Sequence, residues 1–153
     1  MKIADIFRKE HIVEELQSKT KRDVLAELSS VFLQGDVKIS REVVVNTLLE
    51  REKLGSTGIG DGIAIPHGKI SDLDNLIVSF GRSMEGVEFD SMDGKPAHLF
   101  FLLLAPENTT GQHLKTLAKI SKMLKDTTFR KKLMEAKSKN ELYMTIADKD
   151  DAC

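Results

Sequence analysis

Residues 99–105 read Leu-Phe-Phe-Leu-Leu-Leu-Ala, and this run decides which fold class the sequence predicts. The run holds seven residues before Pro106, far fewer than the roughly 20 that a membrane-spanning helix needs. A strand that is apolar at consecutive positions is covered on both of its faces. We therefore predict a strand over His98–Ala105 in the middle of a sheet, with helices packed on either side.

Segments with helical periodicity flank this strand in both directions along the chain. Within residues 22–34, Val24, Leu25 and Leu28 recur at helical spacing, and a Ser-x-x-Glu capping box opens at Ser138. The predicted helices are 22–34, 40–54, 110–125, 127–136 and 138–147. Gly35 and Gly55 are predicted to end the first two helices, and the inward stripe of the second is predicted to be Val43, Val44, Leu48 and Leu49.

Three further strands and one turn complete the predicted elements. The strands are His11–Val13, Gly62–Pro66 and Leu76–Phe80, and Gly86–Lys95 is typical of a turn or hairpin connection. Helices come before and after the strands instead of alternating strictly with them, which favours a mixed sheet. The predicted fold is therefore α/β, a three-layer α/β/α sandwich with a mixed central sheet, formed by residues 1–153 as a single domain.

The composition excludes several classes of partner and site. The 153 residues carry a formal net charge of -1, so no overall positive field attracts nucleic acid or anionic lipid. The only cysteine is Cys153, which excludes an internal disulfide and a cysteine-based zinc site. The N-terminal segment is rich in charge and does not read as a secretion signal, so we expect a cytoplasmic protein without membrane insertion.

A glycine-rich segment at 55–62 leads into Pro66-His67-Gly68. It places four glycines in eight residues, but their spacing is not G-x-G-x-x-G, and the segment follows a helix and enters a strand. Both features exclude a dinucleotide-binding loop. A Walker phosphate loop is excluded because Ile70 stands where the hydroxyl that binds magnesium is needed.

His67 is the residue at which this segment indicates chemistry. A neutral imidazole, whose reference pKa is about 6.5, can attack phosphorus at neutral pH. Phosphoryl transfer requires positioning and stabilisation of charge on the phosphoryl oxygens, and Arg51 in the preceding helix offers a permanent planar charge. The alternative is a turn histidine that bonds a backbone carbonyl. The residues predicted to cradle a phosphoryl group with hydroxyls and unobstructed N–H groups are Ser56, Thr57, Gly58, Gly60 and Gly68.

The other histidines and one aspartate carry weaker signals. His113 lies early in the helix predicted at 110–125, where the helix dipole favours an anion; it is either a second histidine of the site or a capping or surface residue. His98 and His11 are interpreted as structural residues. Asp61 would repel a phosphoryl group and is expected to form a local side-chain turn with the backbone. No two histidines are spaced as local metal ligands, so we expect no metal and no cofactor.

The segment 51–69, Arg-Glu-Lys-Leu-Gly-Ser-Thr-Gly-Ile-Gly-Asp-Gly-Ile-Ala-Ile-Pro-His-Gly-Lys, resembles a known signature. It is similar to the active-site signature of the enzyme IIA domains of the bacterial phosphoenolpyruvate-dependent phosphotransferase system, fructose/mannitol type. The nitrogen-regulatory branch is the most similar. Further counterparts are Leu104-Ala-Pro106, His113-Leu-Lys-Thr-Leu and Glu141-Leu-Tyr, so the likeness extends along nearly the whole chain.

This resemblance implies a set of roles and a donor. His67 would be phosphorylated by a histidine-containing phosphocarrier protein, itself charged through enzyme I from phosphoenolpyruvate. Arg51 would contact the phosphoryl oxygens, and His113 would be the second active-site histidine. The family fold is an α/β/α sandwich with a mixed sheet. The chain departs from the family at Asp61, where relatives commonly carry asparagine.

Three functions remain open at this point. The first is a regulatory phosphocarrier that binds target proteins differently in its two phosphorylation states. The second is a sugar-transport enzyme IIA that passes its phosphate to a IIB domain, and the third is a binding module without transfer chemistry. We favour the first because the chain reads as a free-standing domain and its Gly-Ser-Thr-Gly-Ile-Gly segment resembles the regulatory branch. The third is disfavoured because His67, Arg51 and His113 are all present.

Overall fold

The structure is a computed structural model that describes residues 2–34, 39–109 and 111–153. Its strands are β1 (Ile12–Val13), β2 (Gly58–Gly60), β3 (Ile63–Ala64), β4 (His67–Ile70), β5 (Ile77–Val87) and β6 (Ala97–Pro106). Its α-helices are α1 (Lys21–Ser30), α2 (Arg41–Lys53), α3 (Gln112–Leu124), α4 (Thr127–Glu135) and α5 (Lys139–Ala152). Short 3-10 helices are η1 (Ile3–Asp5), η2 (Lys9–His11) and η3 (Val31–Gln34).

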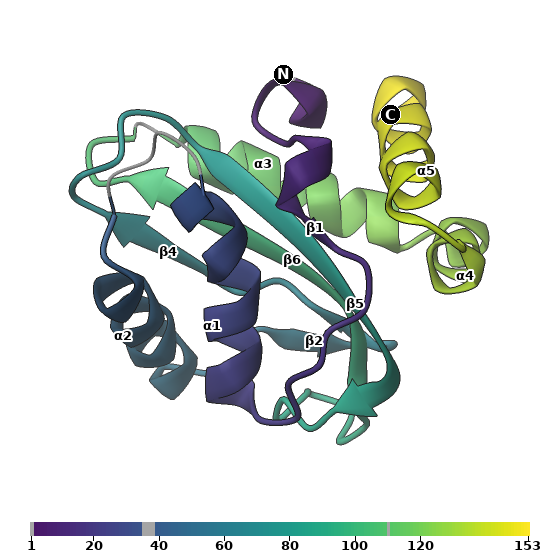
Figure 1. Ribbon diagram of the computed structural model, residues 1–153, viewed down its shortest axis with the longest axis horizontal. Helices are drawn as coiled ribbons and strands as arrows, with labels where there is room; N and C mark the ends of the chain where they lie inside the picture. Colours follow the sequence, from purple (N-terminus) through teal and green to yellow (C-terminus); the bar gives the residue numbers. More distant parts are fainter. Residues whose placement is uncertain (1, 35–38, 110) are drawn as a thin grey trace.

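The six strands form one mixed sheet in the order β1-β5-β6-β3-β2, with β4 also paired to β6. β5 and β6 are antiparallel, whereas β3 and β4 run parallel to β6 and β1 runs parallel to β5. The predicted mixed sheet is therefore confirmed. In Figure 1 the long strands β5 and β6 run through the middle of the molecule, with α1 and α2 on one side and α3, α4 and α5 on the other.

β6 is covered on both faces, as its consecutive apolar residues predict. Residues 99–105 are each at most 2% exposed. Phe100, Leu102 and Leu104 pack in the core that includes the residues of α1 and α2, while Phe101 and Leu103 pack in the core that includes α3, α4 and α5. Burial of every side chain along a strand stabilises it only where helices lie on each face, which confirms the three-layer α/β/α arrangement.

β3 and β4 lie along the same edge of β6 in a single register. Ile63 pairs with Leu99 and His67 pairs with Leu103, four residues further along both strands. The ladder is interrupted between them, because the N–H of Ile65 donates to the carbonyl of Thr57 instead and Pro66 has no N–H to donate. The strand predicted at 62–66 thus continues to Ile70. His67 opens β4, so it is not the turn histidine that was considered as the alternative.

Several other boundaries differ from the sequence prediction. The helix predicted at 22–34 ends as η3, its predicted stop at Gly35 lies outside the described residues, and α5 continues to Ala152. β5 extends to Val87, into the segment predicted as a turn. Val43 is 52% exposed, not part of the inward stripe, because at 3.6 residues per turn it lies opposite the face that Val44 and Leu48 bury.

Candidate functional site

His67 lies at the start of an edge strand. Among the described strands β4 pairs with β6 alone, so the other side of β4 is open to side chains from the neighbouring helices. Parallel strands place paired residues on the same face of the sheet, so His67 projects on the side of Leu103, toward the α3 layer. The helix α2 packs against β4 from the other side.

The ring of His67 is held by a backbone carbonyl. Its Nδ1 lies 2.8 Å from the carbonyl oxygen of Ile65. A carbonyl can only accept a hydrogen bond, so Nδ1 carries the proton and Nε2 keeps its lone pair in the neutral ring. The carbonyl bond that a structural turn histidine would make is therefore present, and it leaves Nε2 as the nucleophilic atom.

Burial lowers the pKa of His67 below its ordinary value of 6.5. The bond to Ile65 and the charge of Glu52 act in the opposite direction, whereas the charges of Arg51 and His113 lower the pKa further. Removal from water disfavours the protonated imidazolium. His67 is consequently neutral at pH 7, with the Nε2 lone pair available.

A cavity of about 480 Å³ brings the three predicted site residues together. Arg51 comes from the last turn of α2, His67 and Gly68 from β4, and His113 from the first turn of α3. The sequence analysis did not single out the remaining lining residues, which are Thr47, Glu50, Leu54, Lys69, Leu103, Ala105, Leu114 and Leu117. Helical spacing offers a signal for four of the lining residues, since Thr47, Glu50, Arg51 and Leu54 fall on one face of a helix.

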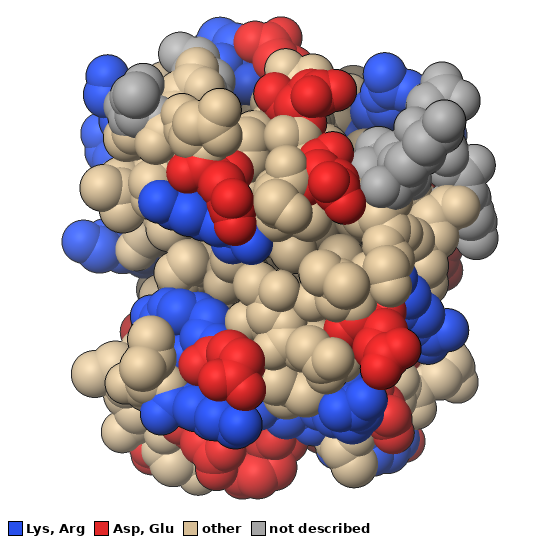
Figure 2. All heavy atoms as spheres, turned by 90° about the vertical axis from the view of Figure 1, so that its left-hand side faces the viewer, with Lys and Arg blue, Asp and Glu red and all other residues tan. Residues whose placement is uncertain are grey.

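The side of the molecule on which α2 and β4 lie is shown in Figure 2. A band of mostly uncharged side chains crosses this face, and side chains of both signs lie above and below it. Two leucines that line the cavity are strongly exposed: Leu54 is 85% exposed and Leu114 is 61% exposed. Apolar side chains left in water beside a polar site are typical of a surface that contacts another protein.

Arg51 and His113 line the cavity, but they differ in their hydrogen bonds to the rest of the protein. Nη1 of Arg51 donates to the carbonyl of Gly55 at 2.9 Å, which fixes one corner of the guanidinium beside the loop and leaves its other N–H groups for an anion. His113 follows Gly111, the left-handed N-cap residue of α3. Its Nδ1 is buried and has no hydrogen-bond partner among the described residues. A buried polar atom without a partner is costly, so His113 is suited to a ligand that enters the cavity.

The two hydroxyls of the predicted phosphate loop donate hydrogen bonds to groups outside the cavity that contains His67. Ser56 Oγ donates to the carbonyl of Phe89 at 2.6 Å, and Thr57 Oγ1 donates to the carboxylate of Glu52. Neither residue lines the cavity with His67. We therefore do not retain Ser56 and Thr57 as direct ligands of a phosphoryl group.

Gly58 and Gly60 also lie away from the cavity, in β2. A Cβ at Gly58 would lie 2.6 Å from Oγ of Ser91, so glycine is required there for close packing of β2 against the segment that contains Ser91. Gly68 does line the cavity, where it lets β4 approach α2. Of the five residues predicted to cradle phosphate, the structure brings only Gly68 to His67.

Asp61 has a conformational role that the sequence analysis missed. It joins β2 to β3 in a tight hairpin with Gly62, and both residues have positive φ, 57° and 77°. Asp-Gly is a favoured pair for such a turn, because aspartate tolerates the left-handed conformation. The backbone N–H of Asp61 donates to the carboxylate of Asp93 at 3.1 Å, in place of the predicted local bond from its own side chain.

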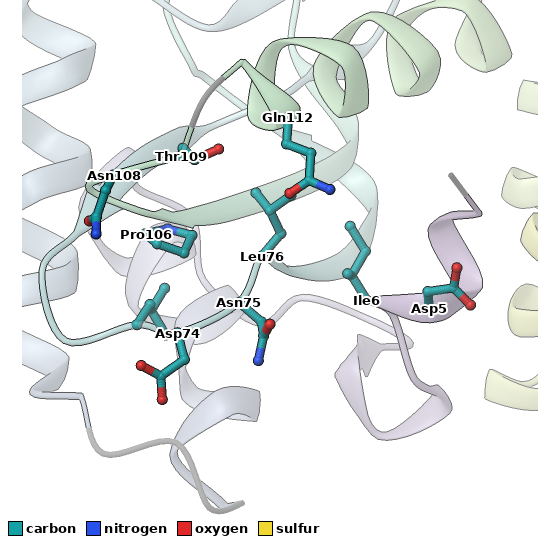
Figure 3. A pocket seen from close by; sticks show the side chains of 10 residues that line it. Asp5, Ile6, Asp74, Asn75, Leu76, Pro106, Asn108, Thr109 and Gln112 are labelled. Carbon is teal, nitrogen blue, oxygen red and sulfur yellow. The ribbon is translucent and has the colours of Figure 1, made fainter.

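A second cavity, of about 620 Å³, lies between the N-terminal segment, the β4–β5 loop and the start of α3 (Figure 3). Its lining includes Asp5, Asn75 and Gln112, and none of the three converging site residues. Most of its polar side chains are exposed. The smaller cavity is the candidate site because it holds the neutral imidazole and the arginine.

The remaining histidines are held by hydrogen bonds to the backbone. His98 Nδ1 bonds the carbonyl of Ser83, and His11 Nδ1 accepts from the N–H of Arg8. Within residues 2–34, 39–109 and 111–153 no three histidine, cysteine or acidic side chains are grouped as metal ligands. Across the same residues, no helix has the length and apolar character to span a bilayer.

Sequence comparisons show the family of the chain. Residues 5–149 match the family model described as "Phosphoenolpyruvate-dependent sugar phosphotransferase system, EIIA 2". A nitrogen regulatory protein of Bradyrhizobium diazoefficiens is 40% identical over 147 residues, 96% of this chain and 95% of that protein. The fructose-specific EIIABC component of Bacillus subtilis is 39% identical over 98% of this chain, but the chain spans only 24% of that longer protein.

Solved structures show the same fold. The crystal structure of nitrogen regulatory protein IIA-Ntr from Neisseria meningitidis is similar with a TM-score of 0.87 at 38% identity, covering 94% of this chain and 98% of that one. Enzyme IIA-mannitol of Escherichia coli, solved in complex with phosphorylated enzyme IIB-mannitol, gives a TM-score of 0.76 at 25% identity, covering 94% and 99%. The chain belongs to the type 2 enzyme IIA family of the phosphoenolpyruvate-dependent phosphotransferase system.

Proposed function

We propose that this chain is a regulatory phosphocarrier whose acceptor atom is Nε2 of His67. The observation that carries the proposal is the bond from Nδ1 to the carbonyl of Ile65, which fixes the neutral ring with its lone pair on Nε2. Burial keeps that lone pair free of a proton by lowering the pKa of His67. Family membership supports a phosphocarrier role, and the resemblance to the nitrogen-regulatory branch supports regulation.

The transfer balances without a cofactor. The Nε2 lone pair forms the new N–P bond while the N–P bond to the donor breaks, and its electron pair returns to the imidazole of the histidine-containing phosphocarrier protein. The proton on Nδ1 stays in place, and the carbonyl of Ile65 stabilises the positive ring that results. Onward transfer reverses these steps and restores the neutral ring.

Arg51 and His113 supply stabilisation of charge. The planar guanidinium of Arg51 lines the same cavity as His67 and can donate two parallel bonds to phosphoryl oxygens. The unpartnered imidazole of His113, at the start of α3, adds a donor at a helix N-terminus, where the dipole favours negative charge. Stabilisation of this kind is the main contribution that a protein makes to phosphoryl transfer.

Regulation follows from the change in charge at an exposed surface. A phosphoryl group adds negative charge and acceptor oxygens to a face on which Leu54 and Leu114 are available for contact with a protein. A target that packs its own apolar side chains on those leucines would bind the two states with different affinities.

A second candidate function is supported by two relatives. The fructose-specific EIIABC component and the enzyme IIA-mannitol complex with phosphorylated enzyme IIB associate this fold with sugar systems. In that case His67 would pass its phosphoryl group to a IIB domain. We favour the regulatory function because nitrogen regulatory protein IIA-Ntr is more similar to this chain, with a TM-score of 0.87 at 38% identity, than enzyme IIA-mannitol, with a TM-score of 0.76 at 25% identity.

The test is reconstitution of the phosphorylation chain. The protein is mixed with phosphoenolpyruvate, enzyme I and the histidine-containing phosphocarrier protein, and the product is examined by mass spectrometry. We expect an acid-labile, base-stable phosphoryl group on His67 that is absent from His67→Ala. Labelling of His67→Ala at the parent rate would refute the assignment. Addition of a fructose-type IIB domain then separates the two functions, because rapid loss of the label to IIB would favour sugar transport.

A further inference from the structure

We propose that Glu52 is a positioning residue that sets the tautomer and orientation of His67 through Thr57 and Ile65. Its effect on phosphoryl transfer rests on the function proposed above, whereas its effect on the tautomer does not. Glu52 lies in the last turn of α2 next to Arg51, yet it does not line the cavity that contains His67. Its charge acts on the ring directly and raises the pKa of His67, whereas its influence on the tautomer and orientation of the ring passes through intervening groups.

Glu52 is a buried carboxylate, 8% exposed, and both of its oxygens are engaged with the loop that follows α2. Oε1 accepts from the backbone N–H of Thr57 at 3.1 Å, and Oε2 accepts from the hydroxyl of the same residue. Lys21 Nζ lies 3.2 Å from Oε1, so the buried charge is paired. A buried carboxylate with this many partners is held in one position.

A chain of hydrogen bonds leads from Thr57 to the ring of His67. The carbonyl of Thr57 accepts from the N–H of Ile65 at 3.0 Å, and the carbonyl of Ile65 accepts from Nδ1 of His67 at 2.8 Å. This is the point at which the ladder between β3, β4 and β6 is interrupted. The hydrogen bond to Thr57 thus fixes the position of Ile65, and the hydrogen bonds to Glu52 fix the position of Thr57.

The position of the Ile65 carbonyl determines which ring nitrogen of His67 carries the proton. Loss of the bond at Nδ1 would allow the proton to occupy Nε2 in the neutral ring, which removes the lone pair that attacks phosphorus. Rotation of the ring would also move Nε2 away from Arg51 and His113. A displacement of about 1 Å at a reacting atom is enough to slow a transfer by up to about 100-fold.

Two variants of Glu52 separate its hydrogen bonds from its charge. Glu52→Gln keeps an oxygen that accepts from the N–H of Thr57 and an amide that donates to its hydroxyl, but it removes the ion pair with Lys21. Glu52→Ala removes all of these interactions. The matched control is Glu27→Ala, because the Glu27 carboxylate on α1 also accepts from a loop N–H and hydroxyl, those of Ser18, without a link to His67.

The first readout is the ¹⁵N chemical shifts of the His67 ring in the unphosphorylated protein, which report the tautomer. We expect the Nδ1–H tautomer to dominate in the parent, in Glu52→Gln and in Glu27→Ala, and a mixture of tautomers in Glu52→Ala. A parent-like spectrum in Glu52→Ala, at a temperature where the variant is folded by circular dichroism, would overturn the proposal.

The second readout is the rate of phosphoryl acceptance from the histidine-containing phosphocarrier protein. We expect Glu52→Ala to lose about 10- to 100-fold while Glu52→Gln and Glu27→Ala stay close to the parent. Equal losses in Glu52→Ala and Glu27→Ala would reduce Glu52 to a structural role. Failure of the parent to accept phosphate would count against the proposed function alone, since the tautomer measurement stands without it.

Discussion

Substitution of Gly68 by alanine tests whether β4 and α2 must lie as close together as the structure places them. A Cβ at Gly68 would lie 3.1 Å from Cγ2 of Thr47 and 3.6 Å from Cδ2 of Leu48. The first contact is shorter than ordinary van der Waals contact by a few tenths of an ångström, so either Thr47 rotates or α2 moves away from the strand. Thr47 lies one helical turn before Arg51, and a shift of α2 therefore moves the guanidinium relative to His67.

The expected magnitude follows from two opposing effects. An extra methyl group in a packed region costs about 1–3 kcal/mol, and this mild overlap belongs near the lower end. Alanine also reduces the conformational freedom of the unfolded chain, which offsets about 0.4–1 kcal/mol at a position with ordinary β dihedrals. We expect a net loss of roughly 0.5–1 kcal/mol in the free energy of unfolding, together with slower phosphoryl acceptance.

A double-mutant cycle with Thr47→Ser makes this prediction specific. Serine lacks Cγ2, so the double variant Thr47→Ser/Gly68→Ala should recover most of the stability and rate that Gly68→Ala loses. Urea unfolding of the four proteins gives the interaction energy, which we expect to be roughly 0.5–1 kcal/mol in favour of the double variant. Additive effects within about 0.3 kcal/mol would refute the close contact between β4 and α2.

Three further predictions concern the site itself. Arg51→Lys keeps the positive charge but loses the planar pair of donors, so phosphoryl acceptance measured by rapid quench should fall about 10-fold or more, and a parent-like rate would contradict the contact. His113→Ala should retain the parent's circular dichroism and show slower acceptance or a shorter-lived phosphoprotein; an unchanged rate and lifetime would make His113 a capping residue. Because burial lowers the pKa of His67, the acceptance rate should stay level as pH falls to 6.5 and decline only below it. The unfolded chain binds more protons than the folded chain in that range, so the free energy of unfolding should also fall below pH 6.5, and less steeply in His67→Asn.

The sheet and its layers were predictable because a strand that is buried on both faces needs apolar residues at consecutive positions. The seven apolar residues 99–105 required cover on both sides, and the structure supplies it. The hairpin at 61–62 also had a local signal, the Asp-Gly pair, which was attributed to side-chain bonding instead of to backbone conformation. β4 had no such signal, since Pro66 and Gly68 are turn residues and its pairing with β6 depends on residues about 36 positions away.

The site was predictable in part. Arg51, His67 and His113 were candidates on their chemistry and spacing, the family resemblance implied a role for each, and the structure places all three around one cavity. In the sequence the hydroxyls of Ser56 and Thr57 read as free donors near glycines, whereas in the structure the carbonyl of Phe89 engages the first and the carboxylate of Glu52 the second. Glu52 itself reads as an ordinary charged helix residue. In the structure it is buried and pairs with Lys21, which lies on another helix and far away in sequence.

The atom of attachment in the phosphorylated protein tests the central claim most directly. After phosphorylation of ¹⁵N-labelled protein, the coupling between phosphorus and the ring nitrogens of His67 identifies the bonded atom. The hydrogen bond from Nδ1 to Ile65 predicts phosphorus on Nε2, with Nδ1 still protonated. Phosphorus on Nδ1, or on any residue other than His67, would contradict the account.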